Sequence, residues 1–381
     1  MKRLIWTVLL AACTSAWSVD DLDGDGITVL EGDCDDLAAD VSPAAVEVCD
    51  GVDNDCDSAT ETALDVPGTY STITVAITAA SDGDTVCLAA GTYYETIDFA
   101  GKDIIVDGKA GADKVLLDGG GGGPVVTFED GESRAAALTN VTVTGGDADK
   151  GAGVYINAAD PTFMHVIIEG NSCTGYTTCQ GTGMYVNGGD PLLVDVVVQD
   201  NEQVAGGSAD VTFYGAGIYA TSSGIELVDV DILDNLIDGR PNSTSYDARL
   251  HGAGAVFYLS DVALDHVDII GNQALSNGSS SSTNTRIVEG GAVELERSSA
   301  DLKWVRIVDN EAQSRVVYGL GLNVYTSSAD SVTIENSIIG GNTGPASYAI
   351  FGGGAYLYAS SGTTLQLTNV DLVGNAPVGT N

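Results

Sequence analysis

Residues 151–171 read GAGVYINAADPTFMHVIIEGN, and the chain repeats this stretch from about residue 138 onward. This stretch begins with a Gly-x-Gly-x-Tyr motif, and Asn171 lies 18 residues after the second glycine of that motif, Gly153. The glycine–asparagine pair occurs seven times, spaced 18 apart in four copies, 19 in the fifth and 21 in the last two. The pairs are Gly153/Asn171, Gly183/Asn201, Gly217/Asn235, Gly254/Asn272, Gly291/Asn310, Gly321/Asn342 and Gly354/Asn375. Repeats of this length are typical of solenoids and propellers.

Aliphatic residues alternate with variable ones just before each Asn. The fifth residue before it is Val166, Val196, Val230, Val267, Val305, Ser337 or Val370, and the third is Ile168, Val198, Ile232, Ile269, Ile307, Ile339 or Leu372. The residue between them tolerates charge: Ile167, Val197, Asp231, Asp268, Arg306, Ile338 or Asp371. This alternation predicts a short strand with one buried face. Because one such strand cannot bury that face alone, we expect successive copies to stack at roughly 4.8 Å as a parallel β-helix.

Two further positions of the repeat indicate where the coils turn; the equivalent residues at one position of all copies are called a column. The sixth residue before the Asn is polar in six of seven copies, as expected at a corner: His165, Asp195, Asp229, His266, Trp304, Asn336 and Asn369. The Asn itself follows Gly or Asp, which suits a left-handed turn, and stacked amides can bond along the axis. The glycines that open each copy allow a tight bend and a close approach of neighbouring coils.

With these columns the chain resembles the right-handed β-helix proteins of the pectate-lyase-like superfamily. The GxG(V/I/M)Y and (G/D)N punctuation is similar to the repeats of polymorphic outer-membrane proteins. The resemblance covers roughly residues 68–381 and implies an all-β, right-handed parallel β-helix, but no particular activity. Members of this fold commonly begin with a capping helix, and Ser71 can N-cap one here. No such helix follows the last coil, so this edge either continues in a longer chain, meets another chain or stays weakly protected.

Composition narrows the classes of partner. The formal charge is −40, with 14 Lys plus Arg against 54 Asp plus Glu. Such a field repels nucleic acid, anionic membranes and acidic polysaccharides, and it attracts divalent cations. We therefore expect no nucleic-acid partner, and a bridging metal for any acidic ligand.

The first residues predict export. Residues 1–18 combine Lys2 and Arg3 with a short apolar run and small residues, as in a signal peptide. Leu10-Ala11-Ala12-Cys13 also resembles a bacterial lipobox, in which the Cys is lipidated; ordinary cleavage a few residues later is the alternative. The apolar run is too short to span a bilayer. We expect a protein at the outer membrane or cell surface or in the extracellular space, with membrane contact only through a lipid anchor.

Six cysteines remain after export, and an even number in an exported chain favours disulfides. They are Cys34, Cys49, Cys56, Cys87, Cys173 and Cys179. Cys173 and Cys179 lie in one inter-coil loop, and a disulfide between them can stabilise that loop. The other four allow three pairings, which the sequence leaves open.

Residues 19–62 predict a calcium-binding module, joined by a linker at 63–68 to the β-helix at 69–381. Asp21, Asp23 and Asp25, followed by Gly26, copy the start of a calcium loop, although position 12 is Gly32 instead of Glu. Glu31, Asp33, Asp35 or Asp36 would have to complete the shell. The segment resembles the cysteine-containing metal-binding motif of secreted bacterial proteins, and an acidic, solvated linker is the alternative. The expected ligands of a structural Ca²⁺ are Asp21, Asp23, Asp25, Asp33, Asp35, Asp53, Asp55 and Asp57.

If the chain has a catalytic or ligand-binding site, we expect it on the middle coils. The longest inter-coil loops are 236–252 and 273–290, and half of the basic residues fall between 240 and 315. Asp231, Asp268 and Arg306 should point outward on consecutive coils, where two carboxylates and a base can act on a glycosidic bond or hold calcium against a uronate. A charge ladder in which Arg306 offsets Asp268 is the plainer interpretation.

Two functions fit these observations. The preferred one is surface display, adhesion or ligand binding, with a carbohydrate or another cell-surface protein as partner. The alternative is a polysaccharide lyase or glycoside hydrolase with its site on coils three to five. No HExxH, GxSxG, Walker loop or CxxC is present, so the sequence favours a protein that is not an enzyme.

Overall fold

The computed structural model describes residues 21–43, 45, 49, 56, 64–207, 209–240, 246–276, 285–327, 329–345 and 349–378. The chain divides into two compact units, Met1–Glu61 and Thr62–Asn381. The expected export signal, Cys13, Asp53, Asp55 and Asp57 lie outside the described residues. Within the described residues, no helix is long and apolar enough to cross a membrane.

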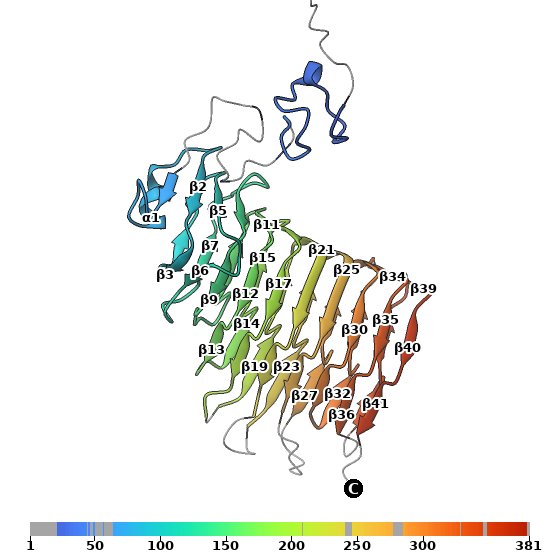
Figure 1. The fold of residues 1–381 in the computed structure, drawn as a ribbon. Coiled ribbons are helices and arrows are strands. Elements are labelled where there is room, and N and C mark those ends of the chain that lie inside the picture. Colours follow the sequence, from blue (N-terminus) through green and yellow to red (C-terminus); the bar gives the residue numbers. More distant parts are fainter. Residues whose placement is uncertain are drawn as a thin grey trace, which may run out of the picture. The chain divides into compact units, whose positions relative to one another are not determined.

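The second unit is a parallel β-helix. Its strands form four sheets in which every pairing is parallel, and each strand pairs with the equivalent strand of the next coil. Figure 1 shows the coils following one another in sequence order, from blue β2 to red β40. The predicted fold is thus confirmed.

Among the described residues, sheet A has 19 strands: most coils contribute two, and two coils contribute one long strand each. They are β1 Leu64–Val66, β2 Thr85–Leu88, β3 Gly91–Tyr93, β5 Ile105–Gly108, β6 Val115–Asp118, β8 Ala137–Thr139, β9 Thr142–Thr144, β11 Thr162–Met164, β12 Ile167–Glu169, β16 Leu192–Val194, β17 Val197–Gln199, β21 Gly224–Leu233, β25 Asp261–Ile270, β29 Ser299–Lys303, β30 Arg306–Val308, β34 Ser331–Glu335, β35 Ile338–Gly340, β39 Thr364–Thr368 and β40 Asp371–Val373. The continuous strands β21 and β25 each span both positions.

Sheets B, C and D take one strand per coil. Sheet B consists of β4 Ile97–Asp98, β7 Val126–Phe128, β10 Val154–Asn157, β15 Met184–Asn187, β20 Ile218–Thr221, β24 Ala255–Tyr258, β28 Val293–Glu296, β33 Leu322–Thr326 and β38 Ala355–Ala359. Sheet C consists of β13 Ser172–Thr174, β18 Glu202–Val204, β22 Leu236–Asp238, β26 Gln273–Leu275, β31 Glu311–Gln313, β36 Thr343–Pro345 and β41 Ala376–Val378. Sheet D consists of β14 Thr178–Gln180, β19 Val211–Tyr214, β23 Ala248–His251, β27 Arg286–Glu289, β32 Val316–Tyr318 and β37 Ala349–Phe351.

Residues with left-handed backbone make the corners. In the coil that contains β19 to β22, the chain turns at Gly215, Ser222, Asp229 and Asp234, whose φ angles are 51°, 54°, 54° and 50°. The whole predicted corner column from His165 to Asn369 has φ between 51° and 57°. Polar or glycine residues dominate these positions because a side chain that is short or can bond its own backbone tolerates this conformation best.

The core confirms the predicted register. Val230 and Ile232 are fully buried, whereas Asp231 between them remains partly exposed. Equivalent aliphatic residues from successive coils join one continuous core, in which Phe128 packs between Phe99 and Phe163. Burying each Val or Ile side chain contributes roughly 1.5–3 kcal/mol, so the stacking of coils provides most of the stabilisation.

The repeated asparagines form the expected ladder along the axis. From Asn171 to Asn342, each side-chain Nδ2 donates to Oδ1 of the next Asn at 2.9–3.1 Å. Each amide also bonds a backbone carbonyl of the preceding coil, as Asn235 bonds Val198 O. The ladder satisfies buried polar groups where the chain turns, as buried amides require.

The helix α1, Ile73–Ala79, lies against β1, β2 and β4 at the first coils. Thr72, instead of the expected Ser71, is its N-cap and accepts a hydrogen bond from Val75 N. The carboxylate of Glu95 accepts from the first backbone N–H groups, and Lys102 Nζ donates to the last carbonyls. Both charges complement the helix dipole. The strand β1, paired with β2, occupies half of the segment expected to be a linker.

Candidate functional site

Two outward-facing columns of side chains run along the solenoid where sheet D turns into sheet B. Strand register defines the column of sheet B as Tyr155, Tyr185, Tyr219, Val256, Glu294, Asn323 and Tyr356. The column of sheet D is Gln180, Tyr214, His251, Glu289, Tyr318 and Phe351. The two columns touch across the turn, since the rings of Tyr214 and Tyr219 have centroids 5.4 Å apart.

Aromatic rings occupy both columns at their two ends. Tyr185 stacks between Tyr155 and Tyr219, with centroids 5.4 and 5.8 Å away, and is nearly buried. Burial raises the pKa of Tyr219 to about 12. Toward the other end, Tyr318 stacks on Phe351 at 5.1 Å. Stacked aromatic pairs of this kind add to stability beyond the area that they bury.

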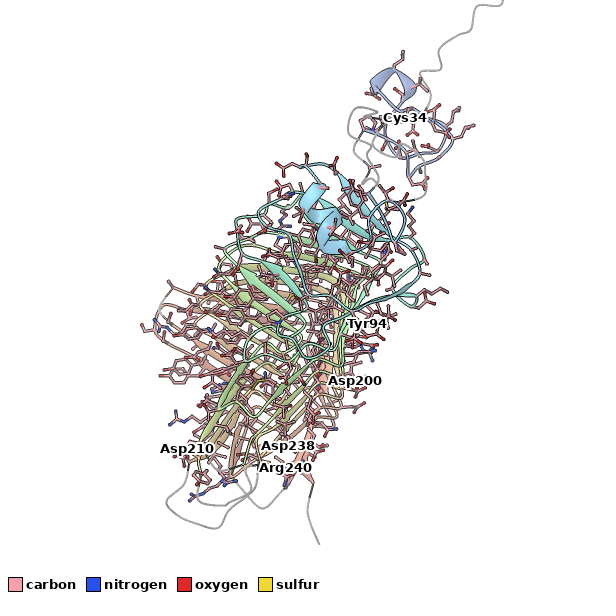
Figure 2. All side chains as sticks on the ribbon, turned by 90° about the vertical axis from the view of Figure 1, so that its left-hand side faces the viewer. Cys34, Tyr94, Asp200, Asp210, Asp238 and Arg240 are labelled. Carbon is pink, nitrogen blue, oxygen red and sulfur yellow. A yellow bond between two sulfur atoms is a disulfide. The ribbon has the colours of Figure 1, made fainter. Side chains whose placement is uncertain are left out.

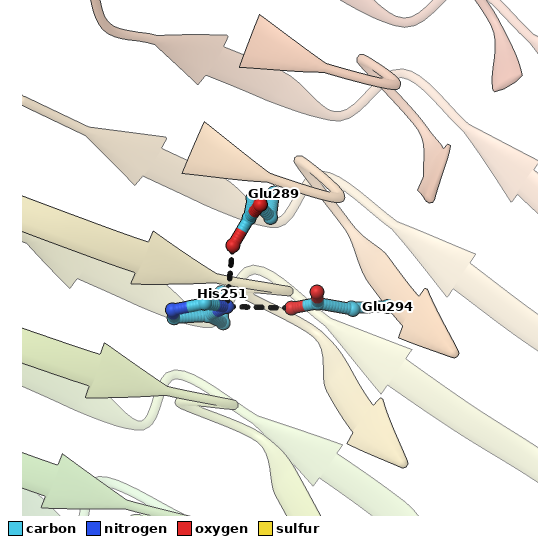
Figure 3. A group of neighbouring side chains, drawn as sticks. All are labelled: His251, Glu289 and Glu294. Atoms are coloured by element: carbon cyan, nitrogen blue, oxygen red, sulfur yellow. Dashed lines mark hydrogen bonds and ion pairs between the residues drawn. The ribbon is translucent and has the colours of Figure 1, made fainter. Parts of the chain in front are cut away.

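Four polar residues on three successive coils interrupt the two columns. Nδ1 of His251 lies 2.7 Å from Oε2 of Glu294 and 3.4 Å from Oε2 of Glu289 (Figure 3). Nδ2 of Asn323 donates to Oε1 of Glu294 at 3.3 Å. The ring of Tyr214 stacks on His251 at 4.4 Å. This arrangement, named here the His–Glu cluster, consists of His251, Glu289, Glu294 and Asn323.

Most of the cluster is buried, and this burial affects the pKa values of its ionisable groups. His251, Glu294 and Asn323 are 7%, 2% and 4% exposed. Burial opposes protonation of His251, but the charges of Glu294, Glu289 and Glu296 outweigh it and raise the pKa of the imidazole. Burial, and then the neighbouring carboxylate of Glu294, raises the pKa of Glu289. The cluster therefore carries more negative charge than its one imidazole can balance.

A groove of about 560 Å³ opens beside the cluster, a size typical of small-ligand sites. Three carboxylates, an amide and four tyrosines dominate its lining: Glu289, Glu294, Glu296, Asn323, Tyr318, Tyr325, Tyr356 and Tyr358. Tyr325 and Tyr358 stack with centroids 4.8 Å apart and are each 45% exposed. The groove thus presents flat aromatic faces next to hydrogen-bond acceptors.

The predicted trio lies on a different surface. Asp231, Asp268 and Arg306 are consecutive partners in sheet A, and Arg306 Nη1 donates to Asp268 Oδ2 at 2.6 Å. Burial, followed by the charge of Asp268, raises the pKa of Asp231. The geometry is that of a charge ladder in which Arg306 offsets Asp268. The trio does not line the groove beside the His–Glu cluster.

The other residues noted in the middle coils are corner or ion-pair residues. His266 stacks on Trp304 at 6.0 Å in the corner column. Figure 2 shows Asp238 and Arg240 side by side at the edge of the solenoid, where they form an ion pair of 2.6 Å. Arg286 is buried and donates to Tyr246 O. The clustered basic residues therefore do not form one site in the described part of the chain.

The N-terminal unit contains a group of carboxylates that face one another. Asp21, Asp23 and Asp25 each offer an oxygen within 4.8 Å of the others. Asp23, Asp25, Asp33 and Asp36 share one pattern: Oδ1 accepts from a backbone N–H, and Oδ2 is buried without a hydrogen-bond partner. Buried carboxylate oxygens without donors are the ligands that a hard cation requires.

The structure distinguishes among the residues expected to complete this shell. Glu31 accepts hydrogen bonds from N and Oγ1 of Thr28 in a capping box of the 3-10 helix Val29–Glu31. Asp35 is exposed, whereas Asp33 and Asp36 are 3% and 7% exposed. Among the described residues, Asp36 therefore shares burial with Asp33, whereas Asp35 does not.

Disulfides hold both units. Cys34 bonds Cys56, with Cα atoms 5.6 Å apart, and Cys173 bonds Cys179, with Cα atoms 6.1 Å apart. Cys49 and Cys87 are also disulfide-bonded. The expected disulfide between Cys173 and Cys179 is confirmed, and it joins β13 to β14 within one coil.

The His–Glu cluster was not among the sites predicted from the sequence. A signal for it exists in the repeat itself, because the Tyr of Gly-x-Gly-x-Tyr becomes Val256, Glu294 and Asn323 in three successive copies. His251 and Glu289 each precede the first glycine of their copies, where Tyr214, Tyr318 and Phe351 stand elsewhere. Departures from a repeat consensus on neighbouring coils mark one location in space, since equivalent positions stack.

These features define a parallel β-helix protein with a small, disulfide-bonded, carboxylate-rich N-terminal unit. Residues 33–61 match the family model Cu-binding MopE, described as "Putative metal-binding motif". No curated protein matches the chain.

Two solved structures are similar to most of the chain at low identity. Pectin methylesterase from Aspergillus niger, in deglycosylated form, is 16% identical over 83% of this chain and 87% of its own, with a TM-score of 0.34. Pectate lyase Pel9A is 15% identical over 76% of this chain and 73% of its own, with a TM-score of 0.33. Neither similarity assigns an activity to this chain.

Proposed function

We propose that this chain is an exported β-helix protein that binds a neutral carbohydrate in the groove beside the His–Glu cluster. The observation that supports this most directly is the stacked, half-exposed pair Tyr325 and Tyr358 next to the carboxylates of Glu294 and Glu296. Aromatic faces pack against the apolar C–H surfaces of a sugar ring, and carboxylates accept hydrogen bonds from its hydroxyls.

Charge selects the class of carbohydrate. The groove contains three carboxylates, and the formal charge of the chain is −40. An acidic polysaccharide would be repelled by this field, whereas a neutral one avoids the penalty. Binding without turnover is the expected activity, in agreement with a role in surface display or adhesion.

The N-terminal unit has a separate role in this proposal: it binds Ca²⁺ as a folding ligand. The buried, unpartnered Oδ2 atoms of Asp23, Asp25, Asp33 and Asp36 support this role, because an oxygen-only shell suits calcium. The disulfides support export, since such bonds persist in oxidising compartments. A unit of this size leans on metals and disulfides for stability.

The carbohydrate proposal is tested with the full exported chain in excess Ca²⁺. Calorimetric titration with a panel of neutral and acidic oligosaccharides is compared for wild type and a Tyr325→Ala/Tyr358→Ala variant. Each ring contributes about 0.5–1.5 kcal/mol, so the variant should bind a neutral oligosaccharide roughly tenfold more weakly. Tyr94→Ala is the matched control, because Tyr94 is 76% exposed and does not line the groove.

Three results would overturn the proposal: no neutral oligosaccharide binds, acidic ones bind better, or the groove variant binds as wild type does. Reducing ends and unsaturated sugars are measured in the same samples. Turnover that the groove variant lacks would replace the binding role with a glycoside hydrolase or lyase at the same groove.

A further inference from the structure

We propose that the His–Glu cluster is a binding site for one divalent transition-metal ion, for which Zn²⁺ is the probe. The ligands are His251 Nδ1, one carboxylate oxygen each from Glu289 and Glu294, and Asn323 Oδ1. This site is separate from the carboxylates of the N-terminal unit, and the inference does not depend on carbohydrate binding.

The spacing of the potential ligand atoms fits a small cation. One atom each from His251, Glu289 and Glu294 lies within 4.8 Å of the others. A tetrahedral Zn²⁺ with bonds of about 2.0–2.2 Å keeps its ligand atoms roughly 3.4 Å apart. Nδ1 of His251 and Oε2 of Glu289 are already 3.4 Å apart. The distance of 2.7 Å to Glu294 is that of a hydrogen bond, and it lengthens when a metal replaces the shared proton.

Asn323 supplies an independent indication of a missing ligand. Its Nδ2 donates to Glu294, but its Oδ1 is buried without a hydrogen-bond partner, and the residue is only 4% exposed. Asn323 is the register partner of Glu294 on the next coil and lines the same groove. A buried amide oxygen without a donor is costly, and a cation in the cluster would satisfy it.

Charge balance also favours a divalent ion. Glu294 is almost fully buried, and Glu289 is half-buried beside it. Within the described residues, the imidazole of His251 is the one basic group paired with the two carboxylates, and it supplies at most one positive charge. A divalent ion supplies the second charge and removes the desolvation cost of an unbalanced carboxylate.

The ligand set selects the type of metal. Imidazole nitrogen suits Zn²⁺ and its transition-metal neighbours, whereas calcium prefers six or more oxygen ligands. Among the three histidines of the chain, His251 is buried, while His165 and His266 are exposed. The described residues of the N-terminal unit contain no histidine. Zn²⁺ and Ca²⁺ should therefore occupy different units of this protein.

The test uses the full chain saturated with Ca²⁺, so that the oxygen ligands of the N-terminal unit are occupied. Calorimetric titration with Zn²⁺ should show saturable uptake of one ion per chain. Co²⁺ in place of Zn²⁺ should give the visible absorption of a low-coordinate site. Glu289→Gln, at a half-exposed position that tolerates substitution, should weaken Zn²⁺ binding about tenfold or more.

His266→Gln is the matched control, because His266 also pairs with a carboxylate, at 2.8 Å from Asp265, but on an exposed corner. Circular dichroism establishes that each variant is folded, and Glu294→Gln provides a second ligand variant. The inference is overturned if Ca²⁺-saturated protein shows no saturable Zn²⁺ uptake. It is also overturned if folded Glu289→Gln and Glu294→Gln variants bind as wild type does, or if His266→Gln loses binding equally.

Discussion

The side-chain amide of Asn235 donates to Oδ1 of Asn272 at 3.0 Å, although the two residues are 37 positions apart and both are fully buried. The Oδ1 of Asn235 in turn accepts from the side chain and backbone N of Asn201. Each asparagine thus joins two coils, and the ladder couples the stability of one coil to that of the next.

Replacing Asn235 with Ala should destabilise the protein by roughly 2–4 kcal/mol, because the change leaves Val198 O and Asn201 N buried without this partner. Urea unfolding followed by circular dichroism measures the loss. Gln366→Ala removes an exposed side-chain hydrogen bond to Thr368 and should change stability by less than about 0.5 kcal/mol. Equal effects of the two substitutions would contradict the importance of the buried ladder.

Gly183→Ala should also destabilise the solenoid, because a Cβ there would lie 2.6 Å from Gly217 O on the next coil and 2.9 Å from Asn201 Nδ2. Backbone in the next coil cannot move away without breaking its pairing, so we expect a cost of about 1–3 kcal/mol. Thermal unfolding checks this. Gly353→Ala is the control, since its nearest contact would be an ordinary 3.5 Å. A Gly183→Ala protein as stable as wild type would show that the coils can separate.

The pH dependence of the free energy of unfolding should show the effect of the raised pKa of Asp231. Burial and Asp268 raise the pKa of Asp231 in the folded state above its ordinary value of 3.8. The folded protein therefore binds this proton more tightly than the unfolded chain, so ionisation lowers stability as pH rises through the folded pKa. The penalty is absent below the ordinary pKa and complete above the raised one.

Asp231→Asn removes this penalty. Because the group is partly exposed and solvent screens its interactions, the variant should be more stable than wild type at neutral pH by only about 0.3 kcal/mol. The difference should vanish in acid, below the ordinary pKa of aspartate. Urea unfolding at several pH values measures it, and the exposed Asp371→Asn in the same column controls for loss of a charge. A variant less stable than wild type at neutral pH would mean that Asp231 has a stabilising partner.

Calcium affinity should depend on Asp25 and Asp36 and little on Asp35. Asp25→Asn and Asp36→Asn each remove a buried, unpartnered oxygen, so both should weaken Ca²⁺ binding about tenfold or more. Asp35 is exposed, and Asp35→Asn should change affinity by less than about threefold. Titration of the full chain with Ca²⁺ by calorimetry tests this order. If Asp35→Asn has the largest effect, Asp35 and not Asp36 completes the calcium shell.

Periodicity allowed the fold to be predicted from particular residues. Val230 and Ile232 alternate with Asp231, and equivalent residues recur at equivalent positions, so the buried face and the register followed from pattern alone. The corner at Asp229 and the ladder at Asn235 followed for the same reason. The N-cap is Thr72 instead of Ser71, and β1 lies within the expected linker, because element ends depend on local contacts that no period describes.

The sequence by itself determined that this protein is a stack of similar coils, since a hydrophobic repeat can be buried only by its own neighbours. It did not reveal that the outward faces of sheets D and B meet along one line. Only the tertiary structure brought His251 within 2.7 Å of Glu294, 43 residues away, and placed Asn323 against the same carboxylate. The physical reason is that a repeat specifies which positions stack within one sheet, whereas the angle between two sheets decides which columns face each other.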